Sequence, residues 1–236
     1  MLGEMNRTIR AGKDFQPMAS PSRSQAADGQ PGGRTAPVTT LSEEDLSSAA
    51  QRDRRKRILD ATLALASKGG YDAVQMRAVA ERADVAVGTL YRYFPSKVHL
   101  LVSALAREFE QFEGRRKPLA GATPQERMHL LLTQVTRAMQ RDPLLTEAMT
   151  RAFMFADASA AAEVDRVGKV MDRFFARALS DEVPSDRQLA IARVISDVWL
   201  SNLVAWLTRR ASATDVTERL ELTVDLLIGN QASGVS

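Results

Sequence analysis

The residues best suited to bind a phosphate backbone lie together in the first half of the chain, where five of the six positions from 52 to 57 are Arg or Lys. They open a predicted helix, and the helix dipole disfavours cations at that end by about 0.3–1 kcal/mol each. Contact with phosphates would reverse this cost. The run therefore favours nucleic-acid binding over its alternative, a solubilising surface. The residues of this run expected to contact DNA are Arg52, Arg54 and Arg55.

The distribution of charge along the chain supports the same interpretation. The net charge of the whole chain is only +3, but residues 51–97 carry ten Lys and Arg against five Asp and Glu, a local charge of +5. Residues 1–50 and residues 98–236 each carry a net charge of −1. A positive excess confined to one short segment is expected where that segment alone faces a polyanion.

Residues with catalytic or metal-binding spacing are missing from the sequence. The chain has no cysteine, which excludes disulfides, thiolate metal sites and cysteine nucleophiles. Its two histidines, His99 and His129, stand 30 residues apart without a matching serine or carboxylate arrangement, and we expect both on the surface. No glycine-rich phosphate loop occurs. We therefore expect no enzyme, no metal site and no bound cofactor.

By composition the chain divides into four regions. Residues 1–46 hold four of the nine prolines and no apolar periodicity, which is typical of a disordered arm. Residues 47–97 form a small helical domain, residues 98–230 a larger one, and residues 231–236 a flexible tail. The start lacks a cleavable apolar leader, and no apolar run approaches the roughly 20 residues that span a bilayer. A cytoplasmic protein without a membrane contact is expected.

Helical periodicity begins at Ser48 and no strand alternation competes with it, which predicts an all-α fold. The first helix ends at the pair Gly69-Gly70. Capping boxes at 123–126 and 185–188, and Pro143 at a first helical position, mark three later helix starts. Further helices are predicted near residues 97–113, 159–179 and 215–228.

Two short helices, over residues 76–83 and 87–94, are predicted around a tight turn, and such a pair is a helix-turn-helix. The second helix presents side chains suited to a DNA groove. Val and Thr can contact a thymine methyl, Arg can bind guanine or phosphate, and a Tyr hydroxyl can bind phosphate. Tyr93 has partial burial as an alternative. The predicted groove-facing residues are Val87, Gly88, Thr89, Tyr91, Arg92 and Tyr93.

The stretch from Gly70 to Leu101, including the run VAVGTLYRYF at 85–94 and Ser96-Lys97, resembles the TetR family of repressors. The resemblance implies that the helix over 87–94 enters the major groove, that Lys97 holds a phosphate, and that Gln75 and Arg77 anchor the preceding helix. Three positions depart from the family pattern. Gln75 and Ala86 stand where a Ser or Thr cap is common, and Asp84 replaces a common turn glycine, a conformation that Asp tolerates.

The larger domain is expected to enclose an apolar ligand cavity, because residues 152–156 are apolar all round and Met171, Phe174 and Phe175 add a polarizable cluster. Ordinary core packing is the alternative for any single residue, and a purely architectural DNA-binding protein would not need this domain. The predicted lining residues are Leu101, Leu105, Phe109, Leu131, Val135, Met139, Leu145, Met149, Phe153, Met171, Phe174 and Trp199.

The last two long helices carry apolar stripes at helical spacing, which one chain could bury internally. The TetR resemblance implies instead that these helices form a homodimer interface, and a dimer suits palindromic operator DNA. The predicted interface residues are Ile191, Ile195, Val198, Trp206, Leu220, Val224 and Leu227.

Within the TetR family, residues 144–160 and 192–216 are similar to actinobacterial members that repress sterol-catabolism genes. That likeness implies a ligand-responsive repressor released by a sterol-derived CoA thioester. The alternative effector is another hydrophobic molecule, such as a fatty acyl-CoA or a drug. In either case the ligand is expected to favour a conformation in which the helix beginning at Ser96 swings the DNA-binding domain away from the operator spacing.

Overall fold

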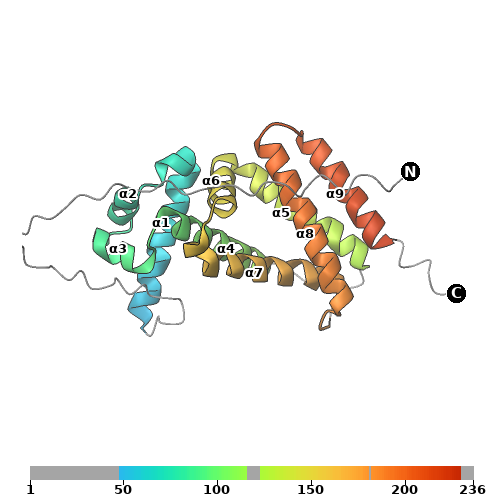
Figure 1. Cartoon of the computed structure of the whole chain (residues 1–236), viewed down its shortest axis with the longest axis horizontal. Coiled ribbons are helices and arrows are strands. Elements are labelled where there is room, and N and C mark those ends of the chain that lie inside the picture. The colour runs from blue at the N-terminus through green and yellow to red at the C-terminus, as the bar shows by residue number, and fades with distance from the viewer. Residues whose placement is uncertain (1–47, 116–122, 181, 230–236) are drawn as a thin grey trace, which may run out of the picture. The chain divides into compact units, whose positions relative to one another are not determined.

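The structure, a computed structural model, describes residues 48–115, 123–180 and 182–229. These residues form α-helices, one short 3-10 helix and no strand, which confirms the predicted all-α fold class. The predicted arm 1–46 and tail 231–236 lie outside the described residues. In chain order (Figure 1), the elements are α1 (Ala49–Ala73), α2 (Met76–Arg82), α3 (Val87–Tyr93), α4 (Lys97–Arg115), α5 (Pro124–Arg141), α6 (Pro143–Met154), η1 (Ala158–Ala160), α7 (Ala161–Leu179), α8 (Asp186–Leu207) and α9 (Ala213–Leu227).

Side-chain caps explain where most of the long helices begin. The two predicted capping boxes are confirmed, because Thr123 and Ser185 each exchange hydrogen bonds with the residue three positions on. The carboxylate of Asp142 accepts a hydrogen bond from the backbone N–H of Leu145, just after Pro143. Further capping boxes begin α1 at Ser48 and α9 at Ser212. The helix boundaries are thus fixed locally by polar groups that satisfy the first backbone N–H groups.

The predicted glycine stop appears as a sharp break near the end of α1. Gly69 and Gly70 both leave the helical conformation, and Gly70 has φ = +67°, a region that favours glycine. A side chain at Gly70 would lie 3.6 Å from the carboxylate of Glu147 and 3.8 Å from Leu144, both on α6. The break therefore turns the chain while leaving α1 in close packing with α6.

A small apolar core holds α1, α2 and α3 together. Ile58 and Leu59 of α1 are fully buried, as are Val79 of α2 and Leu90 of α3. Phe94, directly after α3, is also buried and carries the guanidinium of Arg55 over its ring. The helix-turn-helix also buries Ala80 and Ala83, whereas Val85 is only partly buried.

The remaining helices pack around a cluster of aromatic rings. α4 packs on α6 and α7, α7 on α5 and α8, and α9 on α8 and α5 (Figure 1). Phe174 lies at the centre of the cluster, with ring centroids 5.3 to 6.2 Å from those of Phe175, Phe112 and Phe109. Trp199 joins it from α8, 5.9 Å from Phe109. Tilted and edge-on arrangements of this kind favour a defined packing over a fluid one.

From the sequence we expect no apolar run long enough to span a bilayer, and α8 is the helix that bears on this expectation. α8 is long and apolar enough to span a bilayer by length and composition alone. Only 28% of its most apolar stretch is buried within one copy of the chain. The chain's own helices therefore leave part of α8 at the surface.

We expect Gly70→Ala to destabilise the protein by about 1–2 kcal/mol, because an L side chain is strained at this positive φ. Urea unfolding followed by circular dichroism measures the change. Gly168→Ala is the matched control, since Gly168 lies within α7 with no atom within 4 Å of an added Cβ. Gly168→Ala should raise the free energy of unfolding by about 0.5–1 kcal/mol. Equal effects of the two substitutions would contradict the role of the Gly70 backbone.

Candidate nucleic-acid interface and effector cavity

The turn between α2 and α3 has the backbone of a helix-turn-helix. Asp84 adopts φ = +52° in this turn, as expected for a residue that replaces glycine. Neither Gln75 nor Ala86 makes a side-chain cap, in agreement with the predicted departures. Sequence reasoning missed the group that holds the turn. Arg57 of α1 donates hydrogen bonds to the backbone carbonyls of Ala83 and Asp84, so this member of the basic run has a structural partner.

One side of α3 is uncovered and can face a DNA groove. Val87, Gly88, Tyr91 and Arg92 are exposed at spacings that place them on one side of the helix. We call these four residues the recognition face. Thr89 is partly buried at its margin. The recognition face combines an apolar contact, a close backbone approach, a hydroxyl and a guanidinium.

The prediction that Tyr93 faces the DNA groove is wrong, because this residue is only 5% exposed. Its ring lies 6.4 Å from that of Phe94, in the core beneath α3. Because α3 buries Leu90 and Tyr93 on the same side, Tyr93 cannot share the recognition face. Partial burial, the alternative considered for this residue, is the better description.

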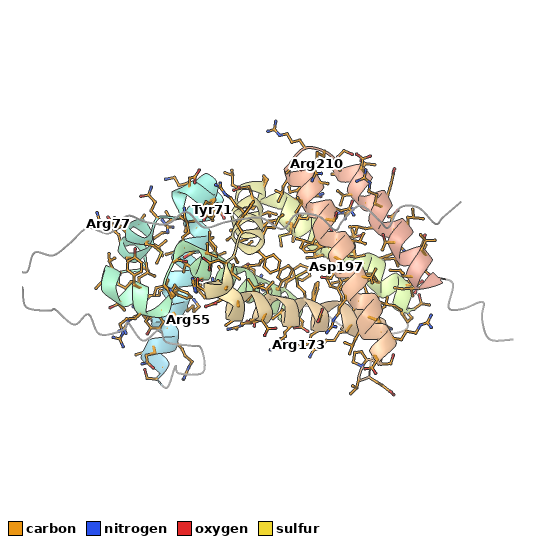
Figure 2. The ribbon with its side chains drawn as sticks, viewed as in Figure 1. Arg55, Tyr71, Arg77, Arg173, Asp197 and Arg210 are labelled. Carbon is orange, nitrogen blue, oxygen red and sulfur yellow. The ribbon has the colours of Figure 1, made fainter. Side chains whose placement is uncertain are left out.

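The DNA-contacting residues predicted on α1 and α2 are partly exposed and partly packed against the chain. Arg52 is exposed near the start of α1, and Arg77 is exposed on the outer side of α2, with Gln75 before it (Figure 2). Arg54 is partly buried. Arg55 lies 5.4 Å above the Phe94 ring, and burial, followed by the charge of Arg107, lowers the pKa of its guanidinium. Arg55 therefore packs within the chain, and it is not placed as a phosphate contact.

Lys97 begins α4 and is held by α1. Its ammonium donates a hydrogen bond to the carbonyl of Tyr71 at 3.1 Å and lies 4.0 Å from the centroid of the Tyr71 ring. Arg151 of α6 approaches the same ring at 4.4 Å. Burial lowers the pKa of Lys97, while the charge of Asp72 opposes the shift and that of Arg151 adds to it. The contacts with Tyr71 thus hold the Lys97 ammonium in a defined position at the start of α4.

Two small apolar cavities lie within the larger set of helices. Cavity A has a volume of about 110 Å³ and lies between α4, α5 and α6. Cavity B has a volume of about 20 Å³ and is lined by residues of α4 to α8. Phe109 and Met139 line both cavities and so form the partition between them.

Nine of the twelve predicted lining residues border these cavities. Leu101, Leu131 and Phe174 are fully buried in the surrounding core and line neither cavity. Polar lining groups were missed, and cavity A has two carboxylates, Glu108 and Asp142, at its wall. The predicted residues that line cavity A or B are Leu105, Phe109, Val135, Met139, Leu145, Met149, Phe153, Met171 and Trp199, and the unpredicted ones include Phe112, Ala138, Thr146, Thr150, Val167, Leu200 and Leu203.

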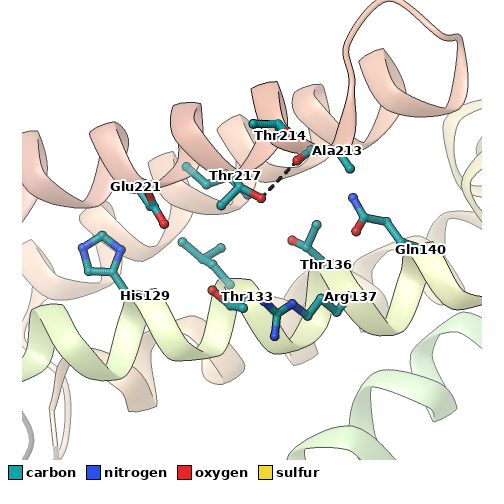
Figure 3. A pocket seen from close by; sticks show the side chains of 11 residues that line it. His129, Thr133, Thr136, Arg137, Gln140, Ala213, Thr214, Thr217 and Glu221 are labelled. Atoms are coloured by element: carbon teal, nitrogen blue, oxygen red, sulfur yellow. Dashed lines mark hydrogen bonds between the residues drawn. The ribbon is translucent and has the colours of Figure 1, made fainter.

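A separate groove of about 320 Å³ lies between α5 and α9 and was not predicted (Figure 3). Most of the residues that line it are polar, and they include Arg137 of α5 and Glu221 of α9, which lies near His129 in the figure. Thr136 on this wall accepts a hydrogen bond from the indole N–H of Trp199, which lines cavity B. α5 therefore separates a polar outer groove from the apolar interior.

Comparison with known proteins identifies the architecture. Residues 58–104 match the family described as bacterial regulatory proteins, tetR family, and residues 121–227 match the tetracyclin repressor-like C-terminal domain. The chain is 74% identical over 213 residues to the HTH-type transcriptional repressor KstR of Rhodococcus jostii, covering 90% of this chain and 97% of that protein. The chain belongs to the TetR family.

Two further relatives agree with this assignment. The HTH-type transcriptional repressor KstR of Mycobacterium tuberculosis is 68% identical over 198 residues, which covers 83% of this chain and 90% of that protein. A solved TetR transcriptional regulator from Rhodococcus sp. RHA1 superposes with a TM-score of 0.71 at 32% identity, covering 78% of this chain and 98% of that one. The TetR architecture thus extends over nearly all the described residues.

In this TetR-family chain, three predicted dimer residues turn inward. Ile195, Leu220 and Val224 are at most 2% exposed and belong to the chain's own core. The other predicted residues, Ile191, Val198, Trp206 and Leu227, are partly buried. The exposed apolar residues of α8 and α9 are instead Val194, Leu222 and Leu226.

We expect Lys97→Gln to weaken the binding of operator DNA. It should also lower the slope of log affinity against log salt concentration by about one, because one phosphate contact is lost. Fluorescence anisotropy with operator DNA at several salt concentrations measures both. Arg137→Gln, which removes an exposed cation from the α5–α9 groove, is the matched control and should leave the slope unchanged. An unchanged slope in Lys97→Gln would remove this residue from the interface.

Proposed function

We propose that the protein is a transcriptional repressor that binds palindromic operator DNA as a homodimer and is released by a sterol-derived CoA thioester. The observation that carries this proposal is the 68–74% identity, over nearly their whole lengths, to transcriptional repressors. The likeness of residues 144–160 and 192–216 to family members that repress sterol-catabolism genes supplies the class of gene and effector. No catalytic step is proposed.

The recognition face reads the operator in the major groove. Arg92 is the residue suited to a guanine edge, Val87 to a thymine methyl, and the Tyr91 hydroxyl to a phosphate. The absence of a side chain at Gly88 supports the approach, because a Cβ there would meet no protein atom within 4 Å and would point into open space. Lys97 and the exposed cations Arg52 and Arg77 add sequence-independent affinity.

Dimerisation places two recognition faces on one operator. Leu222 and Leu226 of α9 are 58% and 59% exposed and lie one helical turn apart, and Val194 of α8 is also exposed. A second copy that covers these residues would bury the apolar surface of α8 and α9. A two-fold dimer suits half-sites about one DNA turn apart.

The effector cavity is too small for a ligand in this conformation, which we call the closed state. Cavities A and B have volumes of about 110 and 20 Å³, whereas a drug-sized ligand occupies roughly 300–1,000 Å³. Binding therefore requires the partition of Phe109 and Met139 to move and the helices to separate. Methionine has three rotatable side-chain bonds, which makes such a movement accessible.

The charge of the cavity wall restricts how a CoA thioester can bind. Glu108 and Asp142 border cavity A, and neither cavity is lined by a Lys or Arg among the described residues. Burial raises the pKa of Glu108, with Arg107 and Arg115 opposing the shift. Since carboxylates repel phosphates, the nucleotide end of the thioester leaves the protein away from this wall, while the apolar part fills cavities A and B.

An operator titration tests the proposed function. Purified protein is titrated with a palindrome from upstream of sterol-catabolism genes, with and without a sterol CoA thioester, a long-chain fatty acyl-CoA, or free CoA. We expect the sterol thioester alone to lower operator affinity by about tenfold or more. Release by the fatty acyl-CoA instead would show that the effector is a fatty acyl-CoA and not a sterol thioester. Release by free CoA would show that the apolar cavities do not bind the effector.

We expect Leu226→Asp to raise the dimer dissociation constant by about tenfold or more, because an unpaired carboxylate would be buried at the interface. Sedimentation velocity measures the oligomeric state. Val183→Asp is the matched control, since Val183 is 93% exposed in the connection before α8 and has no place in the interface. If Leu226→Asp remained as dimeric as Val183→Asp, the proposed interface would be wrong.

A further inference from the structure

The environment of His99 differs from the surface position expected for it. Its side chain is only 6% exposed, and both ring nitrogens have partners. Nδ1 lies 2.9 Å from the hydroxyl oxygen of Ser96. Nε2 donates a hydrogen bond of 2.9 Å to the backbone carbonyl of Ser159, a residue 60 positions further along the chain. The imidazole thus bridges the start of α4 and η1.

Each partner of His99 is itself fixed. The carboxylate of Asp157 accepts hydrogen bonds from the backbone N–H and the hydroxyl of Ser159, so the 3-10 turn is held around that carbonyl. At the other end, the carbonyl of Ser96 accepts the first backbone hydrogen bond of α4, from Leu100. Ser96 therefore precedes the helix directly and neighbours Lys97, the proposed phosphate contact.

The residues before and after η1 in the chain line cavity B. Phe153, before η1, lines this cavity, and so do Val167 and Met171 of α7. A ligand that enlarges cavity B must displace these side chains. η1 lies between these residues in the sequence, and the carbonyl of Ser159 in η1 accepts a hydrogen bond from His99.

We propose that His99 is a positioning residue that transmits the state of the effector cavity to Lys97. In the closed state, η1 holds the imidazole, and the imidazole holds Ser96 and the first turn of α4 in the position that presents Lys97 to a phosphate. When cavity B is filled, η1 moves, and the first turn of α4 moves with it. This role rests on the proposed repressor function and assigns a residue to its regulation.

The two ends of the bridge can be removed separately. In His99→Asn the side-chain amide reaches the position of Nδ1, so the contact with Ser96 is kept and the bond to Ser159 is lost. In His99→Gln the amide reaches the position of Nε2, so the bond to Ser159 is kept. His129→Asn is the matched control, because His129 makes a comparable 3.0 Å bond to Asp225 in a different part of the chain.

The test needs no knowledge of the effector. Leu200→Phe enlarges a side chain that lines cavity B, and such overpacking forces the surrounding helices to shift. Each histidine variant is made with and without Leu200→Phe, and its affinity for an operator selected by the wild-type protein from random-sequence DNA is measured by fluorescence anisotropy. Thermal unfolding by circular dichroism checks that every variant is folded.

We expect Leu200→Phe to weaken operator binding in the wild-type and His129→Asn backgrounds. In His99→Asn its effect should be about threefold to tenfold smaller, the range that one hydrogen bond supports, and His99→Gln should restore most of it. An equal effect of Leu200→Phe in all backgrounds, or no effect in the wild type, would overturn the role of His99. The sterol effector is tested separately, by the thioester titration. A negative result there leaves this experiment unaffected, because no effector is used here.

Discussion

A single rigid helix takes part in both proposed sites, and the rest of the structure is arranged around it. α4 has 19 residues. Its first residue is Lys97, and its middle contributes Leu105 and Phe109 to the cavity walls. A helix moves as a body, because its backbone hydrogen bonds resist local deformation. A displacement of α4 that makes room for a ligand would therefore also displace its first turn, and binding at the two proposed sites would be coupled reciprocally.

Directional polar contacts fix the angle at which α1 and α7 meet this helix. The guanidinium of Arg107 on α4 binds the carboxylate of Asp60 at 2.9 Å and donates to the carbonyl of Lys56 at 3.2 Å, both on α1. Arg166 of α7 forms a forked contact with Glu110 of α4. Such partly exposed pairs add little stability. Their geometry restricts sliding, which apolar packing alone permits.

Local signals in the sequence were sufficient for the helices, because each boundary depends on a few adjacent residues. Thr123, Ser185 and the Gly69-Gly70 pair specify their helix ends without reference to the rest of the fold. The direction of side chains was less predictable. α9 is apolar on two sides, with Leu220 and Val224 inward and Leu222 and Leu226 outward, and periodicity does not say which side meets a neighbour. Arg55 and Tyr93 were misassigned for the same reason, since their partners come from other parts of the fold.

The small volume of the cavities is itself a basis for selectivity. The closed state packs Phe109 and Met139 where the proposed effector would lie, so part of its binding free energy would be used to open the partition. Only a ligand that buries a large apolar surface offsets this cost, at about 25 cal/mol per Å². A polar molecule such as free CoA brings no such surface. The same packing that keeps α4 in place without a ligand thus makes its displacement depend on a bulky apolar one.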